Sequence, residues 1–300
     1  MRFLIVAICM LVTGCSTKSG MTAAERAERE VTKIIRHGNY VIKIQNWPRL
    51  APIIGGKPAE GILNVKHNNC SRTLRKAEWR YYFEQSLDLT GDSEDDLVFY
   101  SWSGGAHGSC DLIIFDSKIN KFHVFYFSQQ LGTENEFLKT FFRTDIPYTF
   151  KDMDKDGLPE VLILYQWPYY GTAFAFSPQY LKIYSLRSSK VLDVTHKFKE
   201  FITRAIAGEE ALLQEYRKKL NQQDILHAKN LTILLMRLYG KVETDTAWKR
   251  YDMVRREFGD KRNAWSSEHI KKDMVKYNEW FKPYTEQNVM SSENTLLGLI

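Results

Sequence analysis

The pattern of apolar positions along the chain changes near residue 193. From about residue 39 to 192, short apolar runs rich in β-branched and aromatic residues alternate with gaps that mostly contain Gly, Pro, Asn or Asp. Runs of this kind predict antiparallel strands joined as hairpins. We expect strands at residues 40–44, 78–83, 96–100, 112–115, 121–127, 161–165 and 180–186.

Beyond residue 193 the apolar positions repeat at helical spacing. The repeat is clearest at Phe198, Phe201, Ile202 and Ala205, and again at Leu231, Leu234, Leu235 and Leu238. Gly240 and Gly259 stand where glycines commonly end helices. Ser266 or Ser267 can cap a further helix that ends near Pro283. The last third of the chain is therefore predicted to be helical.

A shorter helical pattern precedes the strands. Thr22 and Glu25 have the spacing of a capping box, and apolar residues between positions 27 and 35 fall on one side of a helix that Gly38 would end. We therefore expect an α+β protein. A tether and short helix would occupy residues 15–38, a β-rich module 39–192, and a helical domain 193–300.

The first fourteen residues have the layout of a secretion signal. Arg2 precedes an apolar run of roughly ten residues, which is shorter than the about 20 residues that cross a bilayer as a helix. Residues 12–15, Val-Thr-Gly-Cys, resemble the lipobox of bacterial lipoproteins. This resemblance implies that residues 1–14 are removed and that Cys15 carries a lipid; an ordinary signal with a chance cysteine is the alternative. Ser16 resembles the sorting signal for the outer membrane of a Gram-negative cell.

Charge and cysteine content narrow the classes of partner. The chain has 42 Lys and Arg against 36 Asp and Glu, a formal net charge of +6. We attribute this modest excess to solubility and expect no nucleic-acid partner. Cys9 leaves with the signal, so Cys70 and Cys110 remain beside the lipidated cysteine. In an oxidising compartment we expect these two to form a disulfide, with two separately buried thiols as the alternative.

A repeated acidic loop is the most informative motif. Residues 88–96 and 152–160 begin 64 positions apart (152 − 88), and each segment leads directly into an apolar strand. Oxygen-bearing side chains occupy positions 1, 3, 5 and 9 of both loops: Asp88, Thr90, Asp92 and Asp96 in the first, and Asp152, Asp154, Asp156 and Glu160 in the second.

This spacing suits a calcium ion, which takes six to eight oxygen ligands from a tightly turning backbone. In the second loop Gly157 would permit the sharp turn, and a backbone carbonyl near Leu158 would add a ligand. The first loop has Thr90 at its third position and Ser93 where the glycine belongs, so we expect weaker binding there. Acidic turns that bind no ion are the alternative for both loops.

The pattern D-x-D-x-D-G-x-x-[DE] followed by an apolar strand resembles the calcium loops of FG-GAP and VCBS repeats. These repeats are the blades of integrin-α-like β-propellers, and the resemblance covers roughly residues 80–190. It implies propeller-blade-like antiparallel hairpins with calcium as cofactor. Two features depart from the family: only two loops are visible, whereas propellers close with roughly four to eight blades, and the Phe-Gly and Gly-Ala-Pro signatures are absent.

Two loops could carry further chemistry. Residues 101–110 resemble a Ser-Gly-Gly-Ala-His segment of uncharacterised exported bacterial proteins, and there His107 with Ser103 or Cys110 could form a base and nucleophile pair. A plain glycine turn is the alternative. Aromatic residues Trp167, Tyr169 and Tyr170 could stack on a sugar or grip a peptide, unless they serve as packing.

Together these features predict a calcium-stabilised, lipid-anchored protein of the cell envelope with a binding or scaffolding role. The membrane would be reached through the lipid on Cys15, and the further partner would be an envelope protein or a glycan. An envelope hydrolase that uses His107 and a passive structural lipoprotein are the alternative functions.

Overall fold

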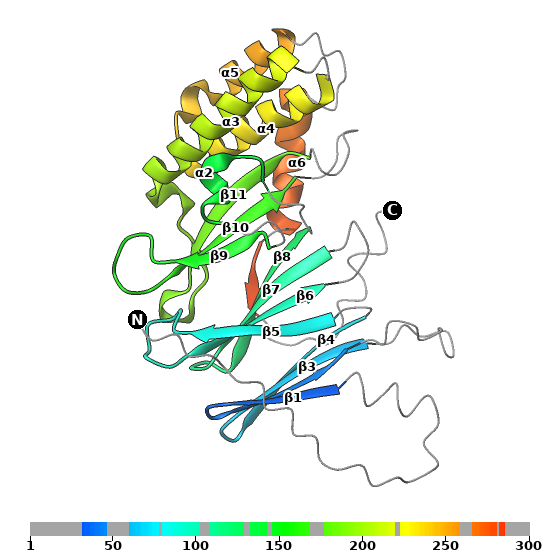
Figure 1. Cartoon of the computed structure of the whole chain (residues 1–300), viewed down its shortest axis with the longest axis vertical. Helices are drawn as coiled ribbons and strands as arrows, with labels where there is room; N and C mark the ends of the chain where they lie inside the picture. Colours follow the sequence, from blue (N-terminus) through cyan, green and yellow to red (C-terminus); the bar gives the residue numbers. More distant parts are fainter. Residues whose placement is uncertain are drawn as a thin grey trace, which may run out of the picture.

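A computed structural model of the chain describes most residues between Thr32 and Thr285 (Figure 1). The described ranges are 32–46, 60–77, 80–102, 109–128, 133–142, 146–167, 177–219, 223–257, 266–280 and 282–285. The signal peptide expected at residues 1–14, the lipid site Cys15 and the tether that follows it lie outside these ranges.

Twelve of the strands follow one another as three antiparallel meanders. Sheet A contains β1 (Thr32–His37), β2 (Tyr40–Gln45), β3 (Glu60–His67) and β4 (Cys70–Ala77) in that order. Sheet B contains β5 (Arg80–Leu87), β6 (Asp96–Trp102), β7 (Ser109–Asp116) and β8 (Lys121–Ser128), and β13 (Tyr284–Thr285) pairs with β8. Sheet C contains β9 (Tyr148–Lys151), β10 (Glu160–Gln166), β11 (Gln179–Ser185) and β12 (Leu192–Asp193).

Most helices follow sheet C in the chain. They are α3 (Lys199–Lys219), α4 (Gln223–Gly240), α5 (Thr244–Glu257) and α6 (Ser267–Trp280). The short α2 (Glu136–Lys139) precedes β9, and the 3₁₀ turns η3 (Arg187–Ser189) and η4 (Thr195–Lys197) flank β12. This arrangement confirms the predicted α+β class with antiparallel hairpins and a helical last third.

The sheets and helices stack as layers from the lower to the upper end of Figure 1. One apolar cluster joins sheet A to sheet B, and it includes Ile42, Val65 and Phe115. A second joins the other face of sheet B to sheet C and reaches α4, α5 and α6. A third lies between sheet C and helices α2, α3 and α4. Because sheets B and C are covered on both faces, strands β6, β7, β8, β10 and β11 bury most of their side chains, whereas β5, β9 and β12 stay more exposed.

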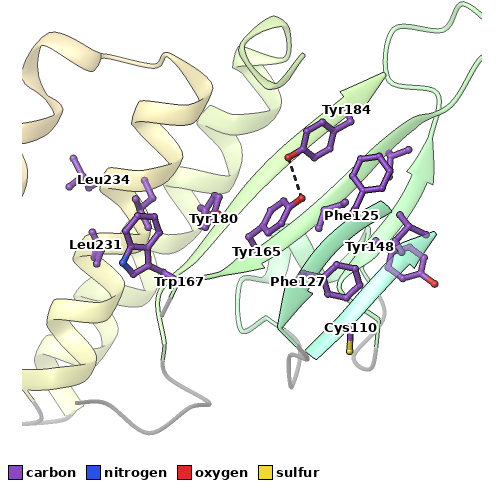
Figure 2. Close-up of a cluster of buried hydrophobic side chains, with 14 of the residues drawn as sticks. Cys110, Phe125, Phe127, Tyr148, Tyr165, Trp167, Tyr180, Tyr184, Leu231 and Leu234 are labelled. Carbon is purple, nitrogen blue, oxygen red and sulfur yellow. Dashed lines mark hydrogen bonds between the residues drawn. The ribbon is translucent and has the colours of Figure 1, made fainter. Parts of the chain in front are cut away.

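Strand β10 illustrates this double burial. All seven of its residues are buried, with Val161, Ile163 and Tyr165 facing sheet B while Leu162 and Leu164 face the helices. The sequence of a strand covered on both faces is a continuous apolar run, and such a run predicts β10 directly. Figure 2 shows the aromatic side chains between sheets B and C, where the hydroxyls of Tyr165 and Tyr184 lie 3.2 Å apart.

All seven predicted strands overlap observed strands, but three of the other predictions need comment. The helix expected before Gly38 is wrong at its C-terminal part, because residues 32–37 form β1 and pair with β2 along their whole length. Pairing lets Ile35 pack on the cluster between sheets A and B, which a solvated helix would not achieve. The described strands form three open sheets and no closed propeller. The change of pattern near residue 193 coincides with the end of β12, although the helices share two apolar clusters with sheet C.

Gly240 ends α4 as expected, but a glycine is required there for close packing and not for a left-handed backbone conformation. The left-handed residue is Lys241, with φ of 50°. A Cβ atom on Gly240 would lie 2.6 Å from Cγ2 of Ile202 in α3, which is closer than carbon atoms approach. The glycine therefore permits α4 to approach α3. Ser266 caps α6, since its hydroxyl accepts a hydrogen bond from the backbone N–H of His269.

Candidate functional site

The two acidic loops occupy equivalent positions in consecutive sheets. The first loop, residues 88–95, joins β5 to β6, and the second, residues 152–159, joins β9 to β10. Each therefore connects the first strand of its meander to the second strand. In sheet A the same connection is the two-residue turn Gly38–Asn39, which explains why the sequence carries no third acidic loop.

Both loops have the same backbone conformation at two critical positions. Position 4 is left-handed in each, at Gly91 with φ of 79° and Lys155 with φ of 64°. Position 6 is also left-handed, at Ser93 with φ of 69° and Gly157 with φ of 93°. Gly157 thus serves the turn as predicted. The first loop places its glycine at position 4 instead and holds a serine in the unfavourable conformation at position 6.

The carboxylate at position 1 organises each turn. In the first loop Asp88 accepts hydrogen bonds from the backbone N–H groups of Gly91 and Ser93, at 2.7 and 2.9 Å. In the second loop Asp152 accepts from the N–H groups of Asp156 and Gly157, at 3.1 and 2.9 Å. Position 5 repeats as well, because Asp92 and Asp156 each accept from the N–H two residues later.

The carboxylate at position 9 closes each loop from a buried site. Asp96 accepts from the N–H groups of Leu89 and Ser117, and Glu160 accepts from that of Met153 at 2.8 Å. Burial raises the pKa of Asp96 to about 7, against the lowering effect of its two backbone hydrogen bonds. Burial likewise raises the pKa of Glu160 above its usual value. The shared pattern at positions 1, 5 and 9 makes the two loops structural repeats as well as sequence repeats.

Three carboxylates of the second loop lie close enough together to contact one cation. Carboxylate oxygens of Asp152, Asp154 and Asp156 lie within 4.8 Å of one another. Two oxygens bound to one calcium ion are at most about 5 Å apart, since each lies roughly 2.3–2.6 Å from the ion. The donor set therefore fits calcium. Among the described residues this is the only group of three such side chains, so Asp88, Thr90, Asp92 and Asp96 do not converge in the same way.

A residue that sequence analysis missed lies on this acidic group. The Arg187 guanidinium contacts Oδ2 of Asp154 at 2.9 Å and Oε1 of Glu160 at 3.4 Å, and it also contacts Asp156. Its side chain is 40% exposed. Arg187 lies 27 positions after Glu160 in the sequence, in the turn η3 that follows β11, and it belongs to no recognisable motif. The arginine supplies the positive charge that the clustered carboxylates need.

The same turn connects the two loops. The backbone N–H of Ser188 donates to the carbonyl of Thr90 at 3.1 Å. Leu158 of the second loop packs against Gly91 of the first, where a Cβ atom would lie 2.8 Å from Cδ1 of the leucine. The two loops and η3 therefore form one cluster, which we call the paired-loop cluster (residues 88–95, 152–159 and 187–189).

The expected disulfide is not present. Cys70 is an exposed free thiol at the start of β4 in sheet A, whereas Cys110 is a buried free thiol in β7 of sheet B. Cys110 lies among the apolar residues that face sheet C, on the side of sheet B turned away from sheet A. Burial raises the pKa of the Cys110 thiol to about 12, although the nearby Tyr100 hydroxyl, 3.1 Å from Sγ, lowers it. A thiol of this kind is a poor nucleophile. Ser103 and His107 lie outside the described residues.

Trp167 is part of the core and not of a ligand-stacking surface. It is fully buried, with ring centroids 5.0 Å from Tyr277 and 5.9 Å from Tyr180. Figure 2 shows its indole beside Leu231 and Leu234 of α4. The ligand-binding expectation is therefore wrong for this residue. Tyr169 and Tyr170 lie outside the described residues.

The helical layer contains a cavity of about 470 Å³ between α3, α4 and α5. Apolar atoms make up most of its lining surface, and the polar side chains of Glu210, Gln214, Asn230, Arg237 and Arg250 line it as well. Its lining residues include Leu213, Ile233, Arg237, Tyr251, Met253 and Val254. Met253 is 56% exposed at its rim. Arg237 is almost completely buried and pairs with Glu210 and Glu243.

Comparison with known proteins identifies no relative: no family model, no curated protein and no solved structure matches the chain. In the part of the chain that the structure describes, no helix is both long and apolar enough to span a membrane.

Proposed function

We propose that this chain is a calcium-stabilised, lipid-anchored protein of the cell envelope that binds a protein partner. The observation that carries the calcium part is the repetition of one loop geometry at equivalent places in sheets B and C. The left-handed conformation recurs at positions 4 and 6, and in both loops the carboxylates at positions 1, 5 and 9 accept hydrogen bonds from backbone N–H groups. The FG-GAP and VCBS resemblance supports the same assignment.

The second loop would be the stronger calcium site. Asp152, Asp154, Asp156 and Glu160 would supply carboxylate oxygens, with a backbone carbonyl near Leu158 as a further ligand. The ion would neutralise acids that otherwise repel each other and would hold β9 to β10. The first loop, with Thr90 at position 3, would bind calcium weakly or serve as a metal-free turn.

The binding role rests on the helical layer. The cavity between α3, α4 and α5 is concave and has a largely apolar lining surface with several polar side chains, and ligands commonly bind in concave, mostly apolar sites. Exposed Met253 at the rim is a flexible, polarisable side chain suited to protein contacts. Burial of Trp167 removes one of the three aromatic residues on which the glycan alternative relied. A protein segment with apolar side chains is therefore the favoured partner.

Anchoring through a lipid on Cys15 follows from the lipobox resemblance alone. It would place the protein in the cell envelope, on the periplasmic side of the outer membrane if the host is Gram-negative. The hydrolase alternative gains no support from the described residues, because the Cys110 thiol has its pKa raised to about 12 by burial. A passive structural lipoprotein is the outcome if no specific partner is captured.

Thermal melting tests the calcium proposal directly. The melting temperature should be higher in calcium than in chelator, and the double variant Asp154→Ala/Asp156→Ala should lose this difference. Exposed Glu136 and Glu268 provide a matched control: their double alanine variant removes the same charge and should keep the calcium shift. A wild-type protein that melts at the same temperature with and without calcium would refute the proposal.

The partner and the anchor need separate experiments. Substitution of the exposed Met253 by glutamate should abolish capture of a specific envelope protein while leaving the melting temperature near that of the wild type. Metabolic labelling with a fatty-acid analogue should mark the wild-type chain and not Cys15→Ser. Labelling of both chains would contradict lipidation at this residue.

A further inference from the structure

The positive charge of the chain is concentrated in one sheet. The described residues of sheet A, 32–46 and 60–77, contain seven Lys and Arg residues and one acidic residue, Glu60. Their formal net charge is therefore +6 (7 − 1), which equals the formal net charge of the entire chain, +6. The remaining residues balance to zero. The net positive charge that we attributed to general solubility in the sequence analysis is therefore confined to sheet A.

The strand register shows which of these charges share a face. Ile42, Ile44, Leu63, Val65 and Leu74 point inward toward sheet B. The alternate residues form the outer face in three rows across the four strands. The rows are Thr32, Gln45, Ile62 and Arg75; Ile34, Lys43, Asn64 and Thr73; and Arg36, Val41, Lys66 and Ser71.

This outer face is cationic and accessible. Each strand contributes one cation, namely Arg36, Lys43, Lys66 and Arg75, and all four are exposed. None of the twelve residues in the three rows is acidic. Ile34 lies among the charges with 62% of its surface exposed. Sheet A is the last layer at the end of the molecule opposite the helices (Figure 1).

We propose that the outer face of sheet A lies on a membrane surface containing anionic phospholipids. Lys and Arg side chains spread over one face attract a negatively charged bilayer without needing a fixed register of partner groups. An exposed isoleucine among them can enter the apolar boundary below the headgroups. The surface would fix which end of the protein faces the membrane, and the helical layer would then point away from it.

The sequence position of sheet A favours a membrane over a soluble anionic partner. This step rests on the proposed lipidation of Cys15. Thr32, the first residue of β1, follows Cys15 by 17 positions (32 − 15), and an extended chain of that length spans at most about 60 Å. Sheet A is therefore the described layer nearest to Cys15 along the chain. The outer face also has no aromatic residue in its three rows, whereas single-stranded nucleic-acid sites and protein hot spots are rich in aromatic residues.

The test is vesicle binding by the full chain. Wild-type protein is compared on vesicles of phosphatidylcholine alone and on vesicles that also contain phosphatidylglycerol, so that any contribution from lipid or the N-terminus is common to both. The variant Arg36→Gln/Lys43→Gln/Lys66→Gln removes three charges from the face. Each basic residue near an anionic surface contributes about fivefold to binding, so the preference for anionic vesicles should fall by roughly 100-fold.

A matched control separates this face from net charge. Lys190, Lys218 and Lys249 are exposed residues outside sheet A, and their triple glutamine variant has the same total charge as the sheet variant. It should keep the preference for anionic vesicles. Equal losses in the two triple variants would overturn the proposal, as would wild-type binding to soluble poly-glutamate without binding to anionic vesicles.

The outcome is independent of whether the anchor exists. Cys15→Ser should lower binding to both kinds of vesicle if the lipid is present, but it should leave the ratio between them unchanged. If the protein carries no lipid but still prefers anionic vesicles, the membrane role of the basic face is supported and the lipid anchor is refuted. A lipidated protein with no preference for anionic vesicles would refute the basic face alone.

Discussion

Replacing Arg187 by glutamine should lower stability without calcium and leave it near that of the wild type with saturating calcium. In the structure its guanidinium contacts Asp154, Asp156 and Glu160, the carboxylates that calcium would use. Arginine and calcium should therefore compete for the same oxygens. Without metal, the variant leaves these acids unneutralised and should melt at a lower temperature. With saturating calcium, the variant no longer has to displace a bound guanidinium.

The magnitude follows from the exposure of the pair. Partly exposed ion pairs contribute at most about 1 kcal/mol each, and the Arg187 side chain is 40% exposed. Three carboxylate partners then give roughly 1–2 kcal/mol for displacing the arginine. Since about 1.4 kcal/mol corresponds to a factor of ten, Arg187→Gln should bind calcium about tenfold more tightly.

Isothermal titration calorimetry measures this difference directly, with Arg187→Lys as a control that retains the charge. The lysine variant should stay close to the wild type. Equal calcium affinities in the wild type and Arg187→Gln would refute competition, even if calcium binds. Binding by the variant and not by the wild type would mean that Arg187 replaces the metal in the native protein.

Three further predictions follow from buried groups. Gly240→Ala should destabilise the protein by about 1–3 kcal/mol in chemical denaturation, because its Cβ would meet Ile202, and Ile202→Ala should relieve part of this loss. In chelator, wild-type stability should fall between about pH 4 and 7 as the buried Asp96 ionises, since its pKa is raised to about 7 in the folded state; Asp96→Asn should flatten this dependence. An alkylating reagent should modify native Cys70 rapidly, whereas Cys110 should react only after unfolding.

The sequence by itself determined the elements whose surroundings leave a clear local pattern. Strands buried on both faces, such as β10, are uninterrupted apolar runs, so they were predicted without knowing their neighbours. The helical third follows from its apolar period. The two acidic loops were also predictable as a repeat, because the turn places hydrogen-bonding carboxylates at fixed positions along a short segment.

Elements that depend on distant partners were not predictable in this way. Strand β3 alternates buried with half-exposed or exposed residues, and β4 has the single buried leucine Leu74 among polar and basic residues, so its local strand signal is weak. Residues 32–37 fit a helical pattern in isolation, but pairing with β2 buries Ile35 and makes them a strand. The free energy gained by pairing with β2 outweighs the weak local preference of these residues for a helix.

Tertiary structure alone decided which charges and side chains meet. It places Arg187 on carboxylates that precede it by 27 or more positions, and it separates Cys70 from Cys110 by assigning them to different sheets. It also buries Trp167 and brings Arg36, Lys43, Lys66 and Arg75 to one face of sheet A. Spacing along a chain fixes the geometry of contacts within a turn, whereas contacts between layers depend on how the sheets stack. The acidic loops were therefore visible in the sequence, and the arginine that neutralises one of them was not.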